Sequence, residues 1–131
     1  MTGLDTNVIV RFLVQDDQEQ SAAAERLFDT FTADAPGFIS VISMVELVWV
    51  LQSCYEVNRN DVLRVMEDLL RTRELIVERA ELIWQSLRLF AKGNADFADC
   101  VIECCGHAAG CDHTMTFDQN AAKSAGMRLL H

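Results

Sequence analysis

Four acidic residues stand apart from the other acids of this 131-residue sequence because they lie within or beside apolar runs. Asp5 follows the first short apolar run, and Glu46 interrupts Met44–Leu51, which is otherwise wholly apolar. Asp99 lies in a largely apolar segment, and Asp118 closes the short run that precedes it. An ionised carboxylate in an apolar setting is costly unless it is paired or bound to a metal ion. These four side chains are therefore candidates for metal chemistry.

A divalent cation would explain how such carboxylates coexist. No lysine or arginine lies beside Glu46, Asp99 or Asp118 along the chain, and two carboxylates about 4 Å apart repel by roughly 4 kcal/mol at an effective dielectric of 20. Ligands that are all oxygens suit Mg²⁺ or Mn²⁺ better than Zn²⁺. Asp96 lies three residues before Asp99, on the same face of a helix. The expected metal ligands are Asp5, Glu46, Asp96, Asp99 and Asp118.

Local hydrogen-bonding roles are the alternative to a metal site. Ser43-x-x-Glu46 matches a capping box, in which the glutamate accepts from the backbone N–H of the serine. Asp96 could cap a helix, and Asp5 could be a turn residue. Most other acids, Glu78 among them, fall in polar turns or on the solvated faces of amphipathic helices.

Short apolar runs alternate with longer helical patterns along the chain. The expected strands are Thr2–Leu4, Phe38–Val41, Leu75–Val77, His113–Phe117 and Met127–Leu130. The expected helices are Val8–Val14, Glu19–Phe31, Ser43–Cys54, Asn60 or Asp61 to Thr72, Arg79–Lys92, Phe97–Ala109 and Gln119–Ser124. Strands separated by helices predict an α/β fold with a parallel sheet covered on both faces.

This arrangement places the candidate acids at one edge of the sheet. They fall at the carboxyl ends of strands or at the starts of the following helices, which share one edge in a parallel sheet and are where ligands bind. The helix that carries Glu46 is apolar almost all round, so we expect this side chain to be buried on every side.

The composition is that of one globular domain spanning residues 1–131: half of the residues are apolar and 24% are charged. The formal net charge is −9, so the chain will not attract nucleic acid by bulk charge and needs a cation between its own carboxylates and phosphate. We expect no leader segment, and Phe38–Leu51 is interrupted by Glu46 and too short to cross a bilayer.

The cysteines indicate a reducing, cytoplasmic setting, because their number is odd and four of the five crowd into twelve positions. Cys100, Cys104, Cys105, His107, Cys111 and His113 also raise the alternative of a zinc-binding protein. Paired CxxC motifs are absent, so buried thiols in place of alanine are the preferred interpretation.

Four motifs give the chain a resemblance to a known family. Leu4–Val8, Glu46–Leu51, Asp96–Ile102 and Thr116–Asp118 resemble, in order, the acidic motifs of PIN-domain proteins, most closely VapC-type toxin ribonucleases of type II toxin–antitoxin pairs. The resemblance implies a PIN-like three-layer α/β/α sandwich with a mainly parallel central sheet. It also implies an Mg²⁺- or Mn²⁺-dependent endoribonuclease that cleaves single-stranded or loop RNA with metal-activated water.

The same resemblance implies roles for individual residues. The catalytic acids are Asp5, Glu46, Asp99 and Asp118, with Asp96 as a secondary acid, and Thr6, Asn7 and Thr116 orient the carboxylates. Two positions depart from the family pattern, because Cys100 and Glu103 fall where small apolar residues are expected.

The implied partners are RNA, a cognate antitoxin and a second copy of the chain, with no membrane and with DNA reached only through the antitoxin. Candidate cations that steer RNA are Arg11, Lys92, Lys123 and Arg128, and candidate antitoxin contacts are Arg11, Arg59, Arg64 and Val62–Leu70. The non-enzymatic alternative is a catalytically silent PIN-like binding module. A phosphotransfer enzyme is disfavoured, because the aspartate needed two residues after Asp5 is Asn7.

Overall fold

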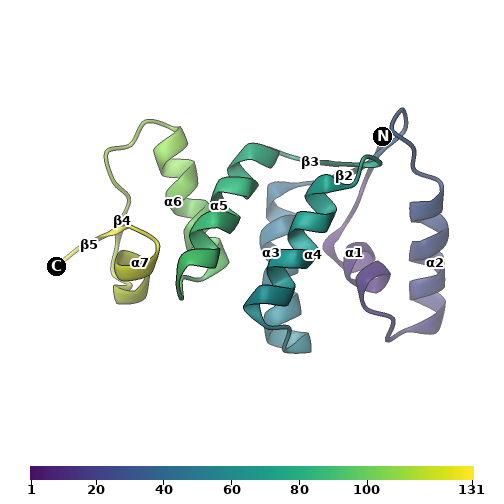
Figure 1. Ribbon diagram of the computed structural model, residues 1–131, viewed down its shortest axis with the longest axis horizontal. Helices are drawn as coiled ribbons and strands as arrows, with labels where there is room; N and C mark the ends of the chain where they lie inside the picture. Colours follow the sequence, from purple (N-terminus) through teal and green to yellow (C-terminus); the bar gives the residue numbers. More distant parts are fainter. The chain divides into compact units, whose positions relative to one another are not determined.

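The computed structural model describes residues 1–131, which form two compact units, Met1–Ala80 (unit 1) and Glu81–His131 (unit 2). Unit 1 holds a parallel three-stranded sheet in the order β1-β2-β3, built from Thr2–Gly3, Gly37–Ile39 and Leu75–Val77. Two helices follow each of the first two strands (Figure 1). They are α1 (Thr6–Leu13), α2 (Gln18–Asp29), α3 (Val41–Tyr55) and α4 (Arg59–Arg71).

Unit 2 combines helices with a second, smaller parallel sheet. The helices are α5, which begins at the boundary (Ala80–Lys92), α6 (Phe97–Ala108) and α7 (Gln119–Ser124). The strands β4 (Met115–Thr116) and β5 (Arg128–Leu129) pair in parallel on either side of α7. The predicted α/β class with parallel strands is therefore confirmed, and every predicted helix and strand is present. Leu75–Val77 has its predicted bounds, and the other four strands are shorter than predicted.

Each unit has its own apolar interior. In unit 1, Ile9, Ile39 and Leu47 are fully buried and come from α1, the central strand and α3. In unit 2, Phe90 and Phe97 are fully buried and meet edge to face, with ring centroids 5.6 Å apart. Burying a side chain of this size contributes about 1.5–3 kcal/mol. None of the helices combines the length and apolar content that crossing a bilayer requires.

The amino terminus of α3 corrects the predicted capping box and shows an added role for the exposed Glu78. Ser40, not Ser43, is the N-cap, and its Oγ accepts from the backbone N–H of Ser43 at 3.1 Å. Glu78, predicted to be a solvated acid, accepts from the backbone N–H of Val41 at 2.9 Å through Oε1. These contacts replace the predicted capping box, so Glu46 is free for another partner.

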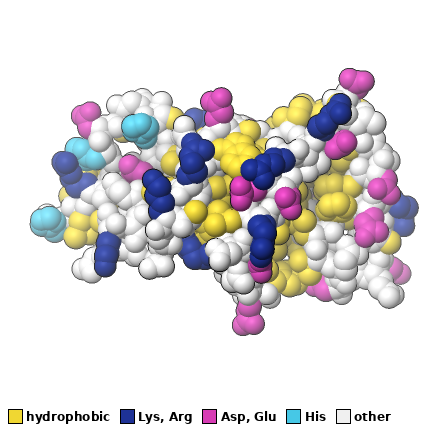
Figure 2. Space-filling model, viewed as in Figure 1, with side chains coloured by type: hydrophobic (Ala, Val, Ile, Leu, Met, Phe, Trp, Pro, Cys, Tyr) yellow, Lys and Arg dark blue, Asp and Glu magenta, His cyan; other side chains and the backbone are white.

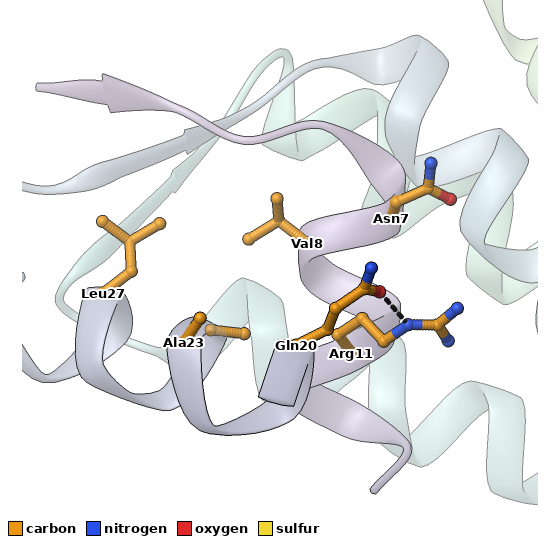
Figure 3. A pocket seen from close by; sticks show the side chains of 7 residues that line it. Asn7, Val8, Arg11, Gln20, Ala23 and Leu27 are labelled. Atoms are coloured by element: carbon orange, nitrogen blue, oxygen red, sulfur yellow. Dashed lines mark hydrogen bonds between the residues drawn. The ribbon is translucent and has the colours of Figure 1, made fainter. Parts of the chain in front are cut away.

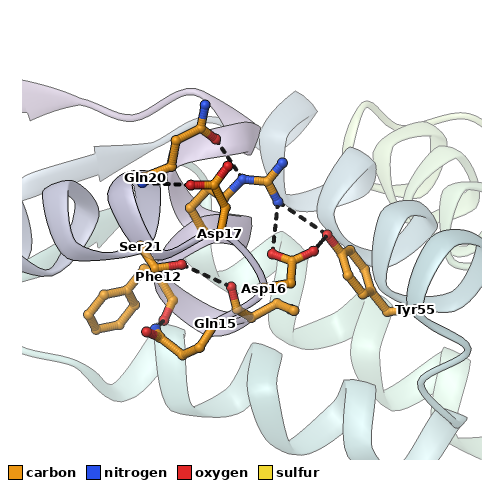
Figure 4. A network of polar contacts seen from close by, with 9 residues as sticks. Phe12, Gln15, Asp16, Asp17, Gln20, Ser21 and Tyr55 are labelled. Carbon is orange, nitrogen blue, oxygen red and sulfur yellow. Dashed lines mark hydrogen bonds and ion pairs between the residues drawn. The ribbon is translucent and has the colours of Figure 1, made fainter.

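A polar network ties the other end of α3 to the α1–α2 turn (Figure 4). Tyr55 Oη donates to Asp16 at 2.8 Å, while Arg11 Nη1 donates to both Tyr55 Oη and Asp16 at 3.2 Å. Arg11 Nε donates to Gln20 at 2.7 Å. The tyrosine hydroxyl and Asp16 hold the pKa of the Arg11 guanidinium above its ordinary value. Arg11 is thus occupied within unit 1, and α3 is held at both ends.

Candidate functional site

Asp5 lies directly after β1 and caps α1. Its backbone is extended, and its Oδ1 accepts from the backbone N–H of Thr6 at 2.8 Å. The strand is held in place by the N–H of Leu4, which donates to the carbonyl of Phe38 at 2.9 Å. Asp5 is exposed, and its Oδ2 takes no part in the cap. Asp5 therefore has the local role of a helix cap, and it also presents a carboxylate at the carboxyl end of a strand.

Thr6 joins α1 to the acid of α3. Its buried hydroxyl donates to Glu46 Oε1 at 2.8 Å, across 40 positions of sequence. Glu46 itself is exposed, so the prediction that it is buried on every side is wrong. The reason is that one stripe of α3 faces solvent although it is apolar in sequence, and the pattern alone could not identify that stripe. This hydrogen bond joins two residues to which the family resemblance gives related roles.

Asn7 does not share that role. It is exposed, and the structure gives it no hydrogen bond to a carboxylate. It lies instead at a cavity of about 330 Å³ between α1 and α2, where Val8, Ala23 and Leu27 line the apolar side (Figure 3). The predicted orienting role of Asn7 is therefore not supported.

Unit 2 holds the second group of acids, at the start of α6. Asp96 occupies the N-cap position but makes no side-chain cap hydrogen bond, so the capping alternative is wrong for this residue. Asp99 is half-buried in the first turn. Burial raises the pKa of the Asp99 carboxyl above its ordinary value, and the negative charges of Asp96 and Asp118 raise it further. The carboxylates of Asp96 and Asp118 therefore oppose the ionisation of Asp99 electrostatically.

Asp118 is placed by the start of α7. Its Oδ1 accepts from the backbone N–H groups of Asn120 at 2.8 Å and Ala121 at 3.2 Å. Thr116 Oγ1 accepts from the backbone N–H of Asp118 at 3.0 Å, so the threonine fixes the backbone rather than the carboxylate. Asn120 Nδ2 donates to the carbonyl of Asn94 at 3.1 Å, which ties α7 to the turn before α6.

Asn94 and Asn120 are positioning residues that sequence reasoning missed. Asn94 follows the predicted helix Arg79–Lys92, and Asn120 lies inside the predicted helix Gln119–Ser124. The available signal was an asparagine two residues after Asp118, at a helix start where side-chain amides bond to the backbone.

Glu103 lies one turn beyond Asp99 on α6 and is half-buried. Its Oε2 is shielded from solvent and has no hydrogen-bond partner. Cys100, the other departure from the family pattern, is fully buried, as expected for a thiol that stands in for a small apolar residue.

The donor chemistry of both acidic groups fits a hard divalent cation. Every candidate ligand is a carboxylate, and Mg²⁺ and Mn²⁺ prefer such oxygens. No three histidine, cysteine, aspartate or glutamate side chains are arranged to hold an ion. The cysteine–histidine segment therefore contains no ready-made zinc site, and the carboxylates within each unit likewise form no ready-made metal site. Ion pairs occupy Asp16, Asp61 and Glu67 instead, outside the two acidic groups.

Comparison with known proteins agrees with this picture. A family model described as the PIN domain matches residues 4–126, which is nearly the whole chain. A VapC ribonuclease from Aquifex aeolicus (strain VF5) is 26% identical to this chain over 121 residues, which covers 92% of this chain and 89% of that protein.

We predict that Thr6 and Glu46 are energetically coupled. In a double-mutant cycle of Thr6→Val and Glu46→Ala, urea denaturation should give a coupling free energy of about 1 kcal/mol, the worth of a partly exposed hydrogen bond to a charged group. The control cycle pairs Thr6→Val with Glu25→Ala, an exposed acid on α2, and should be additive. Equal coupling in both cycles would contradict the contact.

We also predict a pH-dependent stabilisation by Asp99→Asn in metal-free buffer. Because the pKa of Asp99 is raised in the folded state, its ionised form destabilises the fold, and that cost appears as pH rises through the folded-state pKa. The variant should unfold at higher urea concentration than the parent at pH 7, with the gap closing toward pH ~4. The exposed control Asp112→Asn should show no such trend. A variant that is less stable at pH 7 would refute this interpretation.

Proposed function

The chain belongs to the PIN domain family, and we propose that it is a metal-dependent endoribonuclease that cleaves single-stranded or loop RNA as the toxin of a toxin–antitoxin pair. The observation that carries the proposal is the presence of two acidic groups. Asp5, which caps α1, is joined through Thr6 to Glu46 of α3 in unit 1, and Asp96, Asp99 and Asp118 lie at helix starts in unit 2. The Aquifex relative, described as a VapC ribonuclease, supports the reaction class.

The proposal assigns Asp5, Glu46, Asp99 and Asp118 as catalytic acids, with Asp96 as a further metal ligand, in a single domain spanning residues 1–131. These carboxylates would hold Mg²⁺ or Mn²⁺, which when bound supplies Lewis acidity toward water and toward the charge on phosphate. Half-buried Asp99 has the greatest need of a cationic partner, because burial and two neighbouring acids both oppose its ionisation.

The chain's own contribution is orientation. Thr6 holds one oxygen of Glu46 and leaves the other available, and the cap of α1 does the same for Asp5. Asp118 is fixed through its backbone by Thr116 and through its carboxylate by the amino terminus of α7. Each catalytic acid held in this way loses less conformational freedom when ligands bind, which is how a preorganised site gains rate.

The charge of the chain and of its exposed side chains indicates how the proposed antitoxin and RNA would bind. A net charge of −9 favours an antitoxin with a cationic segment that could reach the acids. The acidic side chains scattered over the face of unit 1 in Figure 2 suit such a partner. RNA would be steered by the exposed Lys92, Lys123 and Arg128 of unit 2, because Arg11 is engaged by Asp16. The proposal includes a homodimer, a cytoplasmic location and contact with DNA only through the antitoxin.

We predict that the purified chain cleaves a fluorescent single-stranded RNA in the presence of Mg²⁺ or Mn²⁺. Asp5→Ala and Asp99→Asn should each lower kcat/KM by at least about 100-fold, which corresponds to ~2.7 kcal/mol of transition-state stabilisation. Chelation with EDTA should abolish cleavage, and readdition of Mg²⁺ should restore it. Glu25→Ala serves as the matched acidic control and should cleave at the parental rate.

Folding of each variant is checked by circular dichroism before the rates are compared. If Asp5→Ala cleaves as fast as the parent, the activity comes from a contaminant or from another site, and the assignment fails. If neither the parent nor any variant cleaves RNA but the chain still binds a partner, the alternative of a catalytically silent binding module is preferred over the nuclease.

A further inference from the structure

A cavity of about 340 Å³ lies within unit 1, where the last turns of α1, α2 and α4 meet the start of β3. The charged side chains that line it are two acids, Asp29 and Glu74, and no lysine or arginine lines it. None of the candidate catalytic acids lines it either, so the proposed function gives it no role. The apolar side chains that line it are Phe12, Phe28, Phe31, Leu69 and Leu75.

The aromatic side of the cavity is a continuous surface of three phenylalanine rings. Phe12 and Phe28 stack with their ring centroids 3.9 Å apart, and Phe28 meets Phe31 at 5.4 Å with the ring planes tilted by 59°. Phe31 is buried tightly against the sheet, because a Cβ atom at Gly37 would lie only 2.7 Å from its Cε2. The rings of Phe12 and Phe28 remain half-buried. Faces of aromatic rings attract cations through the ring quadrupole.

The two acids of the cavity have no cationic partner within the chain. Asp29 and Glu74 are exposed, and the ion pairs of the structure involve other acids. Asp29 is the last residue of α2, at the end where the helix dipole favours a cation over an anion. Glu74 is fixed through its backbone, because its carbonyl accepts from the N–H of Gly37 at 2.9 Å. Both carboxylates are therefore available to an external cation.

We propose that this cavity binds the side chain of one arginine or lysine from a basic segment of a partner polypeptide. The phenylalanine and leucine side chains would contact the aliphatic stem and the face of the cationic group, and Asp29 and Glu74 would pair with that group at the opening. The inference goes beyond the proposed function, because it does not depend on whether the chain cleaves RNA.

A basic side chain complements this cavity better than the other candidate occupants do. The phosphates of RNA would be repelled by two carboxylates that no lining cation offsets. A second copy of the chain carries the same net charge of −9, which opposes its approach to an acidic opening. An uncharged apolar side chain would contact the rings but would remove water from the two acids without pairing them.

The first experiment titrates the capped peptide acetyl-Leu-Arg-Leu-amide into the chain and follows the ring-proton NMR signals of Phe12 and Phe28. We expect saturable shifts of both rings. The double variant Asp29→Asn with Glu74→Gln should weaken binding at least about tenfold, because both charges at the opening are lost. Glu25→Gln is the matched control, since this exposed acid lies one turn before Asp29 on α2 and does not line the cavity. It should leave the affinity unchanged.

A second experiment varies the ligand. The same peptide with citrulline in place of arginine keeps the shape of the side chain and removes its charge, so it should bind at least about tenfold more weakly. Spermidine, a free polyamine, tests whether the cavity takes any alkyl cation without a peptide, and it should bind more weakly than the arginine peptide. Phe28→Leu should also weaken peptide binding, and urea denaturation establishes that this variant is folded.

Three outcomes would overturn the inference. Equal affinity for the arginine and citrulline peptides would show that the cavity does not select a cation. An equal loss of affinity in Glu25→Gln and in the double variant would show only general attraction to an acidic surface. Spermidine that binds as tightly as the peptide would make the cavity a polyamine site rather than a partner site.

The proposed function is tested separately in the same proteins. If Asp5→Ala loses RNA cleavage while the parent fails to bind the arginine peptide, only this inference is wrong. If the parent cleaves no RNA but binds the peptide through Asp29 and Glu74, the nuclease is wrong and the cationic anchor site is supported.

Discussion

The unfavourable placement of the Asp99 carboxylate, half-buried and beside two other acids, is the constraint around which the acidic region of unit 2 is built. The acids at the start of α6 and α7 stand close enough for Asp96 and Asp118 to raise the pKa of Asp99, and burial adds to the cost. The ion pairs formed by Arg11, Arg64 and Arg71 with Asp16, Asp61 and Glu67 lie elsewhere on the chain. A divalent cation bound among these carboxylates would offset their repulsion and so favour the folded state. In the proposed function, stability and activity are therefore opposed at these positions, as they commonly are at active sites.

Part of the electrostatic cost of these carboxylates is offset because two of them lie at helix starts that follow parallel strands. Asp5 caps α1 after β1, and Asp118 caps α7 after β4, so each acid accepts backbone N–H groups that would otherwise lack a partner. The positive end of the helix dipole stabilises a carboxylate there by about 0.3–1 kcal/mol. Thr6 supplies the equivalent support to Glu46, which lies in the second turn of α3 and beyond the reach of a cap.

The sequence was sufficient for the order and type of the elements, because the apolar periodicities were strong and the turns carried glycine, proline or asparagine. It was also sufficient to single out Asp5 and Asp118, since both follow apolar strands. The sequence did not predict the exposure of Glu46, because the pattern of a helix that is apolar all round does not reveal which side faces solvent. Glu78 and Asn120 were missed because their partners, the backbone of Val41 and of Asn94, are distant in sequence. Long-range hydrogen bonds of this kind leave no local pattern.

If these acidic residues bind a divalent ion, calorimetric titration of Mg²⁺ or Mn²⁺ into the metal-free chain will show it most directly. We predict saturable binding that Asp99→Asn weakens strongly, together with a metal-dependent rise in the unfolding temperature of the parent, because a ligand that binds the folded state stabilises it. Identical binding isotherms for parent and Asp99→Asn, or an unfolding temperature that saturating metal leaves unchanged, would contradict the account.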